Sequence, residues 1–535
     1  MKKIYFVTLT ILIFFVALFL RVYKLDKVPA SLNWDEVAAG YNAFTIANWG
    51  KDEYGNKFPV VFTSFRDDKH PVHIYITAVF VKFFGLSDFV TRLPSAIVGT
   101  LTVLLMILLG EIIFKNKIVG LFSGLFLALS PYHLQFSRGL WESNFALFFY
   151  ILALVLFYLG LSKKKWLLPL SFFSFGISFF AYHSSKVLVP PTILLLIVLE
   201  YKKFVSDKKY LAISVLVILF FTIFTIFNPR ILGLARVAQT KFSDELVKQT
   251  FVYKKTGNKL LSDGEIILTN YVKYFDPTYL FVKGDQGPRN SVKVIGEFYV
   301  IEGLLLIPGL FALIKYRSRK LLILFCWFFL APLPGAVSGL DVNANRGIFM
   351  LGPIELVAGA GAVLLLEILQ KKWWKIAVVA TILIVLSIEF TRYIKYYYQV
   401  YVIKDSIEWQ YGMKDSVLYA QKHPEFNAIY VDKIRQQPYI FFLFYLKEPL
   451  PELLKTVKYD QTEASSYNTV SSFGRYNFGN WYTVDSIPSP DILYILTPSY
   501  HSGLRYLSSF TTQKLVKYPD GSDAFYLVSG GNGYE

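Results

Sequence analysis

Cysteine and charged residues are both scarce in this sequence. Cys326 is the single cysteine among 535 residues, which excludes an intrachain disulfide. Charged residues make up only 17% of the chain, whereas hydrophobic residues make up 54%. This balance excludes an ordinary soluble protein and is typical of a chain that crosses a membrane several times.

Positive charge is largely missing from the apolar stretches themselves. The formal net charge is +17, which in a soluble protein would suggest a nucleic-acid partner. Here the lysines and arginines sit largely in short loops between apolar stretches. Membrane orientation and contact with anionic lipid explain this placement better. We therefore expect membrane lipid as a partner and no nucleic acid.

Eleven apolar stretches are candidates for transmembrane helices, which need about 17–25 residues. They are 4–22, 92–114, 118–136, 144–162, 166–183, 187–203, 210–227, 299–315, 321–337, 348–369 and 374–391. The sequence thus predicts a mainly α-helical, polytopic bundle of about 11 spans over residues 1–391. A smaller domain is expected over residues 392–535.

The basic loops predict how these helices are oriented. If the helices alternate across the membrane, the basic loops fall on one side, at 2–3, 115–117, 163–165, 202–209, 315–320 and 371–372. The positive-inside rule makes that side cytoplasmic. The chain is then a multi-pass cell-membrane protein with a cytoplasmic N-terminus and an extracytoplasmic C-terminal domain. The same parity makes 72–85 a membrane-surface or half-inserted helix, and a short true span is the alternative.

Three longer segments are predicted to lie outside the cell: a first outer loop over 23–91, a long outer loop over 228–298, and the tail. In the tail we expect helices over 408–423 and 438–446, strands over 428–431 and 491–496, and a hairpin over 515–528. Strands that alternate with helices indicate a small α/β domain. It has no glycine-rich phosphate loop and no obvious nucleophile, so we expect a supporting or acceptor-facing role.

Acidic residues are concentrated in the first outer loop. Asp35 and Glu36 follow the first apolar helix, and Asp67-Asp68-Lys69-His70-Pro71 closes the loop. Adjacent carboxylates do not face the same way on regular structure, so we expect one to face a cavity and the other to pair locally. The alternative is structural: Asn33 caps a helix that has favourable acids in its first turn. The second acidic pair in the same loop favours a catalytic role.

Further charged residues lie at the outer ends of predicted helices. Arg138 and Glu142 stand four apart, either as a surface ion pair or with Glu142 joining the acidic site. Lys186 follows His183 in a tight turn, where it either meets a phosphate or simply extends to the membrane interface. A guanidinium at Arg346 suits an anionic head group. Weaker candidates are Arg236, Asp285 and Arg289.

Carboxylates and cations on one membrane face suggest one type of reaction. A carboxylate deprotonates a hydroxyl nucleophile as general base, and cations stabilise charge on a departing phosphate. A lipid phosphate as leaving group explains why such an enzyme lies in a bilayer. Inverting glycosyl transfer from a lipid-phosphate sugar fits this pattern.

The residues resemble those of the GT-C membrane glycosyltransferases, in the group of protein O-mannosyltransferases and lipid A aminoarabinose transferases. The resemblance covers about residues 1–390 and is best in the first outer loop and through Thr91-Arg92-Leu93-Pro94. It implies that Asp35 is the general base and that Lys69 contacts the lipid phosphate. It also places a second-loop carboxylate at Glu142 and a donor-phosphate arginine at Arg346.

This resemblance completes the predicted site. Catalysis is assigned to Asp35, Glu36 and Glu142, and donor-phosphate binding to Lys69, His70, Arg138, Lys186 and Arg346. Asp68 is the candidate metal ligand. The family divides over metal dependence, so no cofactor is certain and a divalent metal stays open. The expected partners are a polyprenyl-phosphate sugar donor and a hydroxyl-bearing acceptor on a lipid, glycan or protein.

The sequence departs from the family pattern in two places. The mannosyltransferases have His-Pro-Pro at the end of the loop, where this chain has Val72 in place of the second proline. The aminoarabinose transferases carry an arginine three positions after the aspartate, where this chain has Ala38. The reaction class therefore carries over better than the identity of donor or acceptor.

Two other functions are alternatives. An oligosaccharyl- or O-antigen-type transferase would use a lipid-pyrophosphate donor, and a Trp-Trp-Asp-type acceptor motif would favour oligosaccharyl transfer. The tail has only Asn480-Trp481-Tyr482. A transporter or flippase would carry ionisable residues inside its spans and inverted repeats. Here the charges cluster at the outer ends, and no internal repeat is present.

The predicted orientation is open to a direct test. A reporter fused to the C-terminus should be accessible from outside intact cells, because an odd number of spans separates it from the cytoplasmic N-terminus. Accessibility to an impermeant labelling reagent measures this. A cytoplasmic reporter would contradict the helix count.

Overall fold

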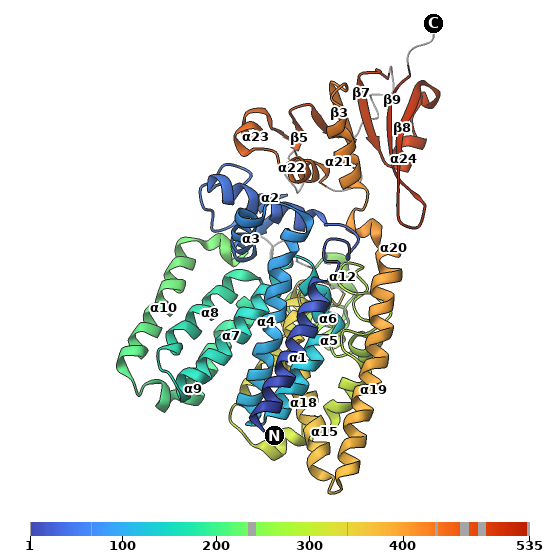
Figure 1. Ribbon diagram of the computed structural model, residues 1–535. Helices are drawn as coiled ribbons and strands as arrows, with labels where there is room; N and C mark the ends of the chain where they lie inside the picture. Colours follow the sequence, from blue (N-terminus) through green and yellow to red (C-terminus); the bar gives the residue numbers. More distant parts are fainter. Residues whose placement is uncertain are drawn as a thin grey trace. The chain divides into compact units, whose positions relative to one another are not determined.

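The structure is a computed structural model, and Figure 1 shows the course of the chain. It describes residues 2–65, 67–233, 242–339, 341–433, 437–460, 470–479 and 488–531. The chain packs into two units. The first consists of Met1–Tyr23 and Ser95–Tyr396, and the second of Lys24–Pro94 and Tyr397–Glu535.

The first unit is a bundle of apolar helices. They are α1 (Lys3–Val22), α4 (Asp88–Phe114, which starts in the second unit), α5 (Lys117–Leu129), α6 (Pro131–Arg138), α7 (Glu142–Ser162), α8 (Leu167–Ala181), α9 (Ser185–Phe204), α10 (Lys208–Phe227), α15 (Val300–Tyr316), α16 (Leu321–Leu330), α17 (Leu333–Val337), α18 (Pro353–Ile368) and α19 (Lys372–Tyr396). Helix α8 packs against α7, α9 and α10, and the four stand side by side in Figure 1.

Every one of the eleven predicted stretches coincides with a helix or a helix pair. Among the described residues, six helices are long and apolar enough to cross a membrane. The number is seven if α5 and α6, which meet at a bend of 58°, form one broken span. Others, such as α8, are apolar but shorter. The chain is thus a multi-pass membrane protein, and the count of eleven spans stays a prediction.

Glycine lets two of these helices touch backbone to backbone. A Cβ atom on Gly309 of α15 would lie 2.3 Å from the carbonyl oxygen of Val357, on α18. A Cβ atom on Gly361 of α18 would lie 2.1 Å from the carbonyl oxygen of Leu305. Small residues at such contacts are the usual means of close helix association in membranes.

The long outer loop contains helices that the sequence reading did not predict. They are a 3₁₀ turn η1 (Pro229–Leu232), α12 (Asp244–Gln249), α13 (Phe251–Thr256), α14 (Lys259–Lys273) and a π-helical segment η2 (Thr278–Lys283). The side chains of Ser243, Thr250 and Asn258 accept N–H groups at the starts of α12, α13 and α14. These caps are a local sequence signal for each helix. The weaker candidate Arg236 lies outside the described residues.

The first outer loop folds within the second unit. It forms α2 (Trp34–Trp49), a two-stranded antiparallel hairpin of β1 (Phe62–Ser64) and β2 (Asp67–Lys69), and α3 (Pro71–Phe84). Helix α3 confirms the predicted helix over 72–85. Its position at a membrane surface stays a prediction.

The tail forms a seven-stranded mixed sheet with helices. The strand order is β4-β5-β6-β3-β7-β9-β8, and β3 runs parallel to both neighbours. The strands are β3 (Ala428–Asp432), β4 (Lys458–Tyr459), β5 (Val470–Phe473), β6 (Tyr476–Gly479), β7 (Ile492–Leu496), β8 (Phe510–Lys517) and β9 (Asp523–Gly530). The helical segments are η4 (Tyr397–Tyr401), α20 (Val402–Lys404), η5 (Ser406–Trp409), α21 (Met413–Lys422), α22 (Pro438–Leu446), α23 (Leu450–Thr456), α24 (Pro498–Ser502) and η7 (Leu507–Ser509).

The predicted tail elements are present, with one correction. The helix expected over 408–423 starts only at Met413, after the short η5 turn. Gln410 and Gly412 adopt positive φ angles of 52° and 94°, which interrupt a right-handed helix. Strands β4, β5 and β6 were not predicted, because they have only two, four and four residues.

Candidate active site

The first acidic pair opens α2, and Asn33 caps this helix. The Asn33 Oδ1 atom accepts the backbone N–H groups of Asp35 at 2.8 Å and Glu36 at 3.1 Å. In return, the Glu36 Oε2 atom accepts the backbone N–H of Asn33 at 3.1 Å. This reciprocal arrangement is a capping box, so the structural reading of Asn33 is confirmed.

Glu36 points into the interior, where it pairs with Arg92. The Arg92 Nε atom lies 2.7 Å from Glu36 Oε1, and Arg92 Nη2 lies 2.9 Å from Glu36 Oε2. Glu36 is 1% exposed and Arg92 is fully buried. The guanidinium also donates to the carbonyl oxygens of Leu25, Pro29 and Ser31. Both oxygens of Glu36 therefore belong to the framework that holds the start of α2.

Asp35, one residue earlier, is accessible. Its side chain is 43% exposed, and its Oδ1 atom lies 2.5 Å from the Lys69 Nζ atom. Lys69 pairs with Phe62 in the β1–β2 hairpin and is itself only 7% exposed. Asp35 is thus accessible, whereas Glu36 is buried and hydrogen-bonded to Asn33 and Arg92. This difference agrees with the expectation that adjacent acids face different ways.

Asp68 and His70 flank Lys69 in the same unit. Asp68 pairs with Thr63 across the hairpin and is partly buried. His70 is buried and precedes Pro71, the first residue of α3. The hairpin and the start of α3 therefore position these two side chains next to Lys69 along the chain.

Glu53 is a buried acid of this loop that the sequence reading missed. Its Oε1 atom accepts a hydrogen bond from the Ser64 hydroxyl at 3.2 Å, and its backbone N–H donates to Asn42 Oδ1 at 3.0 Å. Burial, together with the nearby charge of Asp52, raises the pKa of Glu53 to about 8, while Lys69 acts in the opposite direction. The signal was present as a third acidic pair, Asp52-Glu53, in the same loop.

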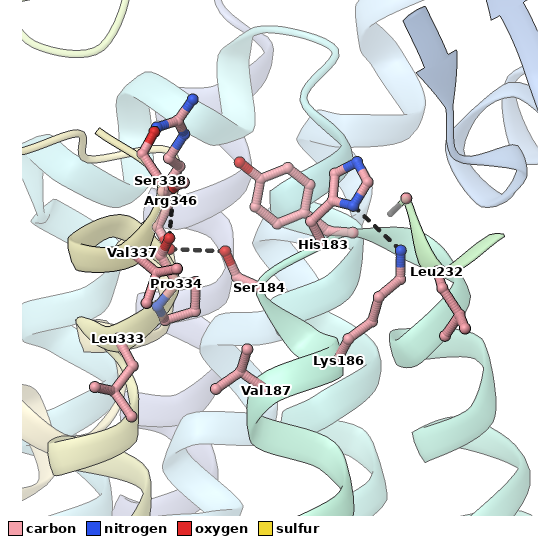
Figure 2. Close-up of a pocket in the computed structure, with 12 residues that line it drawn as sticks. His183, Ser184, Lys186, Val187, Leu232, Leu333, Pro334, Val337, Ser338 and Arg346 are labelled. Carbon is pink, nitrogen blue, oxygen red and sulfur yellow. Dashed lines mark hydrogen bonds between the residues drawn. The ribbon is translucent and has the colours of Figure 1, made fainter. Parts of the chain in front are cut away.

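Lys186 and Arg346 line one cavity of about 340 Å³ in the first unit (Figure 2). The Lys186 ammonium group lies 3.2 Å from His183 Nδ1 and also donates to the Ile231 carbonyl oxygen. The Ser184 hydroxyl donates to the Arg346 carbonyl oxygen at 2.8 Å. Much of the remaining lining is apolar: Val187, Leu232, Leu333, Pro334 and Val337. The cavity therefore combines basic groups with apolar walls.

A network of hydrogen bonds fixes the loop that carries Arg346. The Asn343 Oδ1 atom accepts the Arg346 backbone N–H at 3.0 Å, and the Asn343 N–H donates to the Tyr274 hydroxyl at 3.0 Å. Asp285 accepts the backbone N–H of Ala344 at 2.6 Å. Asp285, a weaker candidate from the sequence, thus helps to hold this loop. The Arg346 guanidinium itself donates to the Ser338 carbonyl oxygen.

Arg138 is buried and binds the end of α1. Its Nη1 and Nη2 atoms donate to the carbonyl oxygens of Leu20 at 2.6 Å and Tyr23 at 2.9 Å. A cation at this position compensates the negative end of the helix. Arg138 ends α6, whereas the partly exposed Glu142 begins α7. The two are therefore not an i,i+4 pair on one helix.

The described residues contain no group of three or more His, Cys, Asp or Glu side chains arranged to hold a metal ion. A protein site for a divalent ion normally offers several such ligands. The described residues therefore do not supply a divalent-ion site at Asp68.

The sequence profile of the dolichyl-phosphate-mannose-protein mannosyltransferase family matches residues 68–227. Over this segment, which is less than half of the chain, the sequence is similar to that family. The chain is a membrane glycosyltransferase, which confirms the GT-C resemblance noted from the sequence. No curated protein sequence matches the chain.

Solved structures of other glycosyltransferases share the fold. ArnT from Cupriavidus metallidurans, in a crystal structure bound to undecaprenyl phosphate, is 14% identical with a TM-score of 0.57. The match covers 99% of this chain and 99% of that chain. The oligosaccharyltransferase of Archaeoglobus fulgidus, tethered to an acceptor peptide, is 14% identical with a TM-score of 0.53. That match covers 100% of this glycosyltransferase chain and 74% of that chain.

The buried pair of Glu36 and Arg92 predicts a large loss of stability when one partner is removed. Arg92→Met should destabilise the glycosyltransferase by about 3–5 kcal/mol, because it leaves the Glu36 carboxylate buried without its cation. Adding Glu36→Gln to that variant should recover part of the loss. Thermal unfolding midpoints in detergent measure both effects.

The control for this test is Lys455→Ala. It breaks an exposed pair with Glu452 in the same unit, and such pairs contribute about 0–1 kcal/mol. An unchanged midpoint for Arg92→Met would show that the pair does not hold α2.

Proposed function

We propose that this glycosyltransferase moves one sugar from a polyprenyl-phosphate donor to a hydroxyl acceptor outside the cell, with inversion at the anomeric carbon. The observation that carries the proposal is the accessible carboxylate of Asp35, held 2.5 Å from the Lys69 ammonium group at the start of a capped helix. The match to a family named for dolichyl-phosphate-mannose donors and the lipid phosphate bound to ArnT support the donor class.

Asp35 acts as general base in this proposal. Its carboxylate takes the proton of the acceptor hydroxyl while that oxygen attacks the anomeric carbon of the sugar. The bond between the anomeric carbon and the phosphate oxygen breaks, and polyprenyl phosphate leaves with the bonding electrons. Glu36 is then a positioning residue, because Asn33 and Arg92 use its carboxylate to fix the start of α2. Glu142 stays a proposed catalytic acid without an assigned step.

Cations stabilise the phosphate that departs. Lys69 is the proposed contact next to the base, with His70 as its neighbour along the chain. Lys186 and Arg346 are proposed to bind donor phosphate from the basic cavity of the first unit, whose apolar walls suit a lipid. We assign Arg138 to the framework, since its guanidinium binds the carbonyl oxygens at the end of α1.

The role of Asp35 is tested by Asp35→Asn. The amide keeps the size of the side chain but accepts no proton, so transfer should fall by about 10²–10⁴-fold. Release of polyprenyl phosphate from a panel of polyprenyl-phosphate sugars, with purified protein in lipid, measures this. The control is Asp26→Asn, an exposed acid of the same loop.

Turnover close to that of the unchanged protein would remove Asp35 as the base. If no polyprenyl-phosphate sugar is a donor but a pyrophosphate-linked oligosaccharide is, the alternative oligosaccharyl- or O-antigen-type function takes its place.

The phosphate contacts are tested by Lys69→Ala and Arg346→Ala, each made alone. Each should weaken donor binding by about ten- to hundredfold, because a hydrogen bond to a charged group contributes about 1.5–3 kcal/mol. The affinity for the acceptor should change much less. Titration of a donor analogue, with the exposed Lys57→Ala as control, measures this. Unchanged donor affinity would assign the phosphate to other residues.

A further inference from the structure

The pairing of Asp35 with Lys69 limits what Asp35 does as a base. An ammonium group 2.5 Å from a carboxylate oxygen stabilises the ionised carboxylate and lowers its tendency to take a proton. If Asp35 removes the proton of the acceptor, as proposed above, its contact with Lys69 has to loosen during the reaction. Besides the donor phosphate proposed above, a second anionic partner from the protein is then favoured for the Lys69 ammonium group, because it lies in a buried setting with only 7% of the residue exposed.

Glu53 has the properties of such a partner. It is 3% exposed and interacts electrostatically with Lys69. Its Oε1 atom accepts the Ser64 hydroxyl, whereas its buried Oε2 atom has no hydrogen-bond partner among the described residues. A buried carboxylate oxygen without a partner is costly, so an approaching donor is favoured there.

Glu53 is also attached to both elements that carry the Asp35–Lys69 pair. Its backbone N–H donates to Asn42 on α2, the helix that begins beside Asp35. Its carboxylate accepts from Ser64, which belongs to the same hairpin as Lys69. These bonds tie Glu53 to the two elements whose ends carry the Asp35–Lys69 pair.

We propose that Glu53 is a positioning residue: its buried carboxylate is a second acceptor for the Lys69 ammonium group and so controls how tightly Lys69 holds Asp35. The proposal rests on the proposed role of Asp35. It goes beyond it by giving a function to an acid that has no part in the transfer step. When Glu53 is ionised it draws Lys69 toward itself, and Asp35 becomes the stronger base.

The surroundings of Glu53 indicate when it is ionised. The groups that interact with it are Asp52 from its own loop, Lys69 from the hairpin, and four tyrosines: Tyr41 of α2, Tyr54 of the loop, Tyr439 of α22 and Tyr459 of β4. Burial raises the pKa of Glu53 to about 8, so its proton leaves to solvent over the mildly alkaline range. We therefore expect Asp35 to be the stronger base in that range.

The experiment is the pH profile of kcat for Glu53→Gln. In the unchanged protein kcat should rise between about pH 7 and pH 9, as Glu53 ionises. Glu53→Gln should lack this rise, because the amide keeps the Ser64 bond but has no charge. The kcat of the variant should equal that of the unchanged protein near pH 6 and be about tenfold lower near pH 9. A change of one unit in the pKa of the base corresponds to about a tenfold change in its proton affinity. Glu53→Asp should restore the rise in part.

Two further measurements separate this role from a structural one. In a Lys69→Gln background, Glu53→Gln should have no additional effect, since Glu53 acts through Lys69. The thermal midpoint of Glu53→Gln at pH 8 should be no lower than that of the unchanged protein. The folded-state pKa of Glu53 lies above its ordinary value of 4.5, so its contribution to stability is lost as pH rises toward 8. Glutamine does not titrate and avoids this loss.

The outcomes are distinguishable. If the unchanged protein transfers sugar, Asp35→Asn stops it, and Glu53→Gln matches the unchanged protein at every pH, this inference is wrong while the proposed function stands. If Asp35→Asn retains activity, the proposed function fails first. An equal loss for Glu53→Gln in the Lys69→Gln background would also overturn the inference, because it would show that Glu53 acts independently of Lys69.

Discussion

The ion pair of Glu36 and Arg92 fixes the place where α2 begins, and the orientation of Asp35 depends on it. Two oppositely charged groups in a buried setting are tolerated only when their remaining donors and acceptors are also satisfied. Here the backbone of Asn33 and the carbonyl oxygens of residues 25, 29 and 31 complete the set. The neighbouring Asp35 is thereby held on the accessible side of a rigid helix start, as the role of base proposed for it requires.

Buried arginines play a comparable part in the first unit. Arg138, from α6, binds the carbonyl oxygens at the end of α1. Arg21, from α1, donates in turn to the carbonyl oxygens of Leu127 and Ala128 at the end of α5. An arginine of α6 thus binds the C-terminal end of α1, and an arginine of α1 binds the C-terminal end of α5. Both satisfy carbonyl groups that have no partner within their own helix.

Helix starts and turns, which depend on residues close together in the chain, could be predicted from the sequence. Side-chain pairs between residues far apart in the chain could not. Asn33 and Glu36 stand three apart, so the capping box and the start of α2 are readable, and the hairpin turn of β8 and β9 is readable for the same reason. Glu36 pairs with Arg92, which is 56 residues away, and Asp35 pairs with Lys69, which is 34 residues away. The hydrophobic periodicity of a sequence predicts helices and strands, but it does not indicate which distant residues form ion pairs. The same limit explains why Arg138, an outer-end arginine by sequence, is a buried helix cap.

The bond between the Arg346 guanidinium and the Ser338 carbonyl oxygen has a consequence for ligand choice. It restricts the rotamers of a long side chain before any ligand arrives, so binding costs less conformational entropy. It also sets a competition, since a ligand that recruits this donor has to be a better acceptor than a peptide carbonyl. A zwitterionic or neutral headgroup gains little from the exchange, whereas a doubly charged phosphate monoester gains much. If the cavity binds donor phosphate as proposed, this bond favours the leaving group of a transfer reaction over the bulk lipid that surrounds the protein.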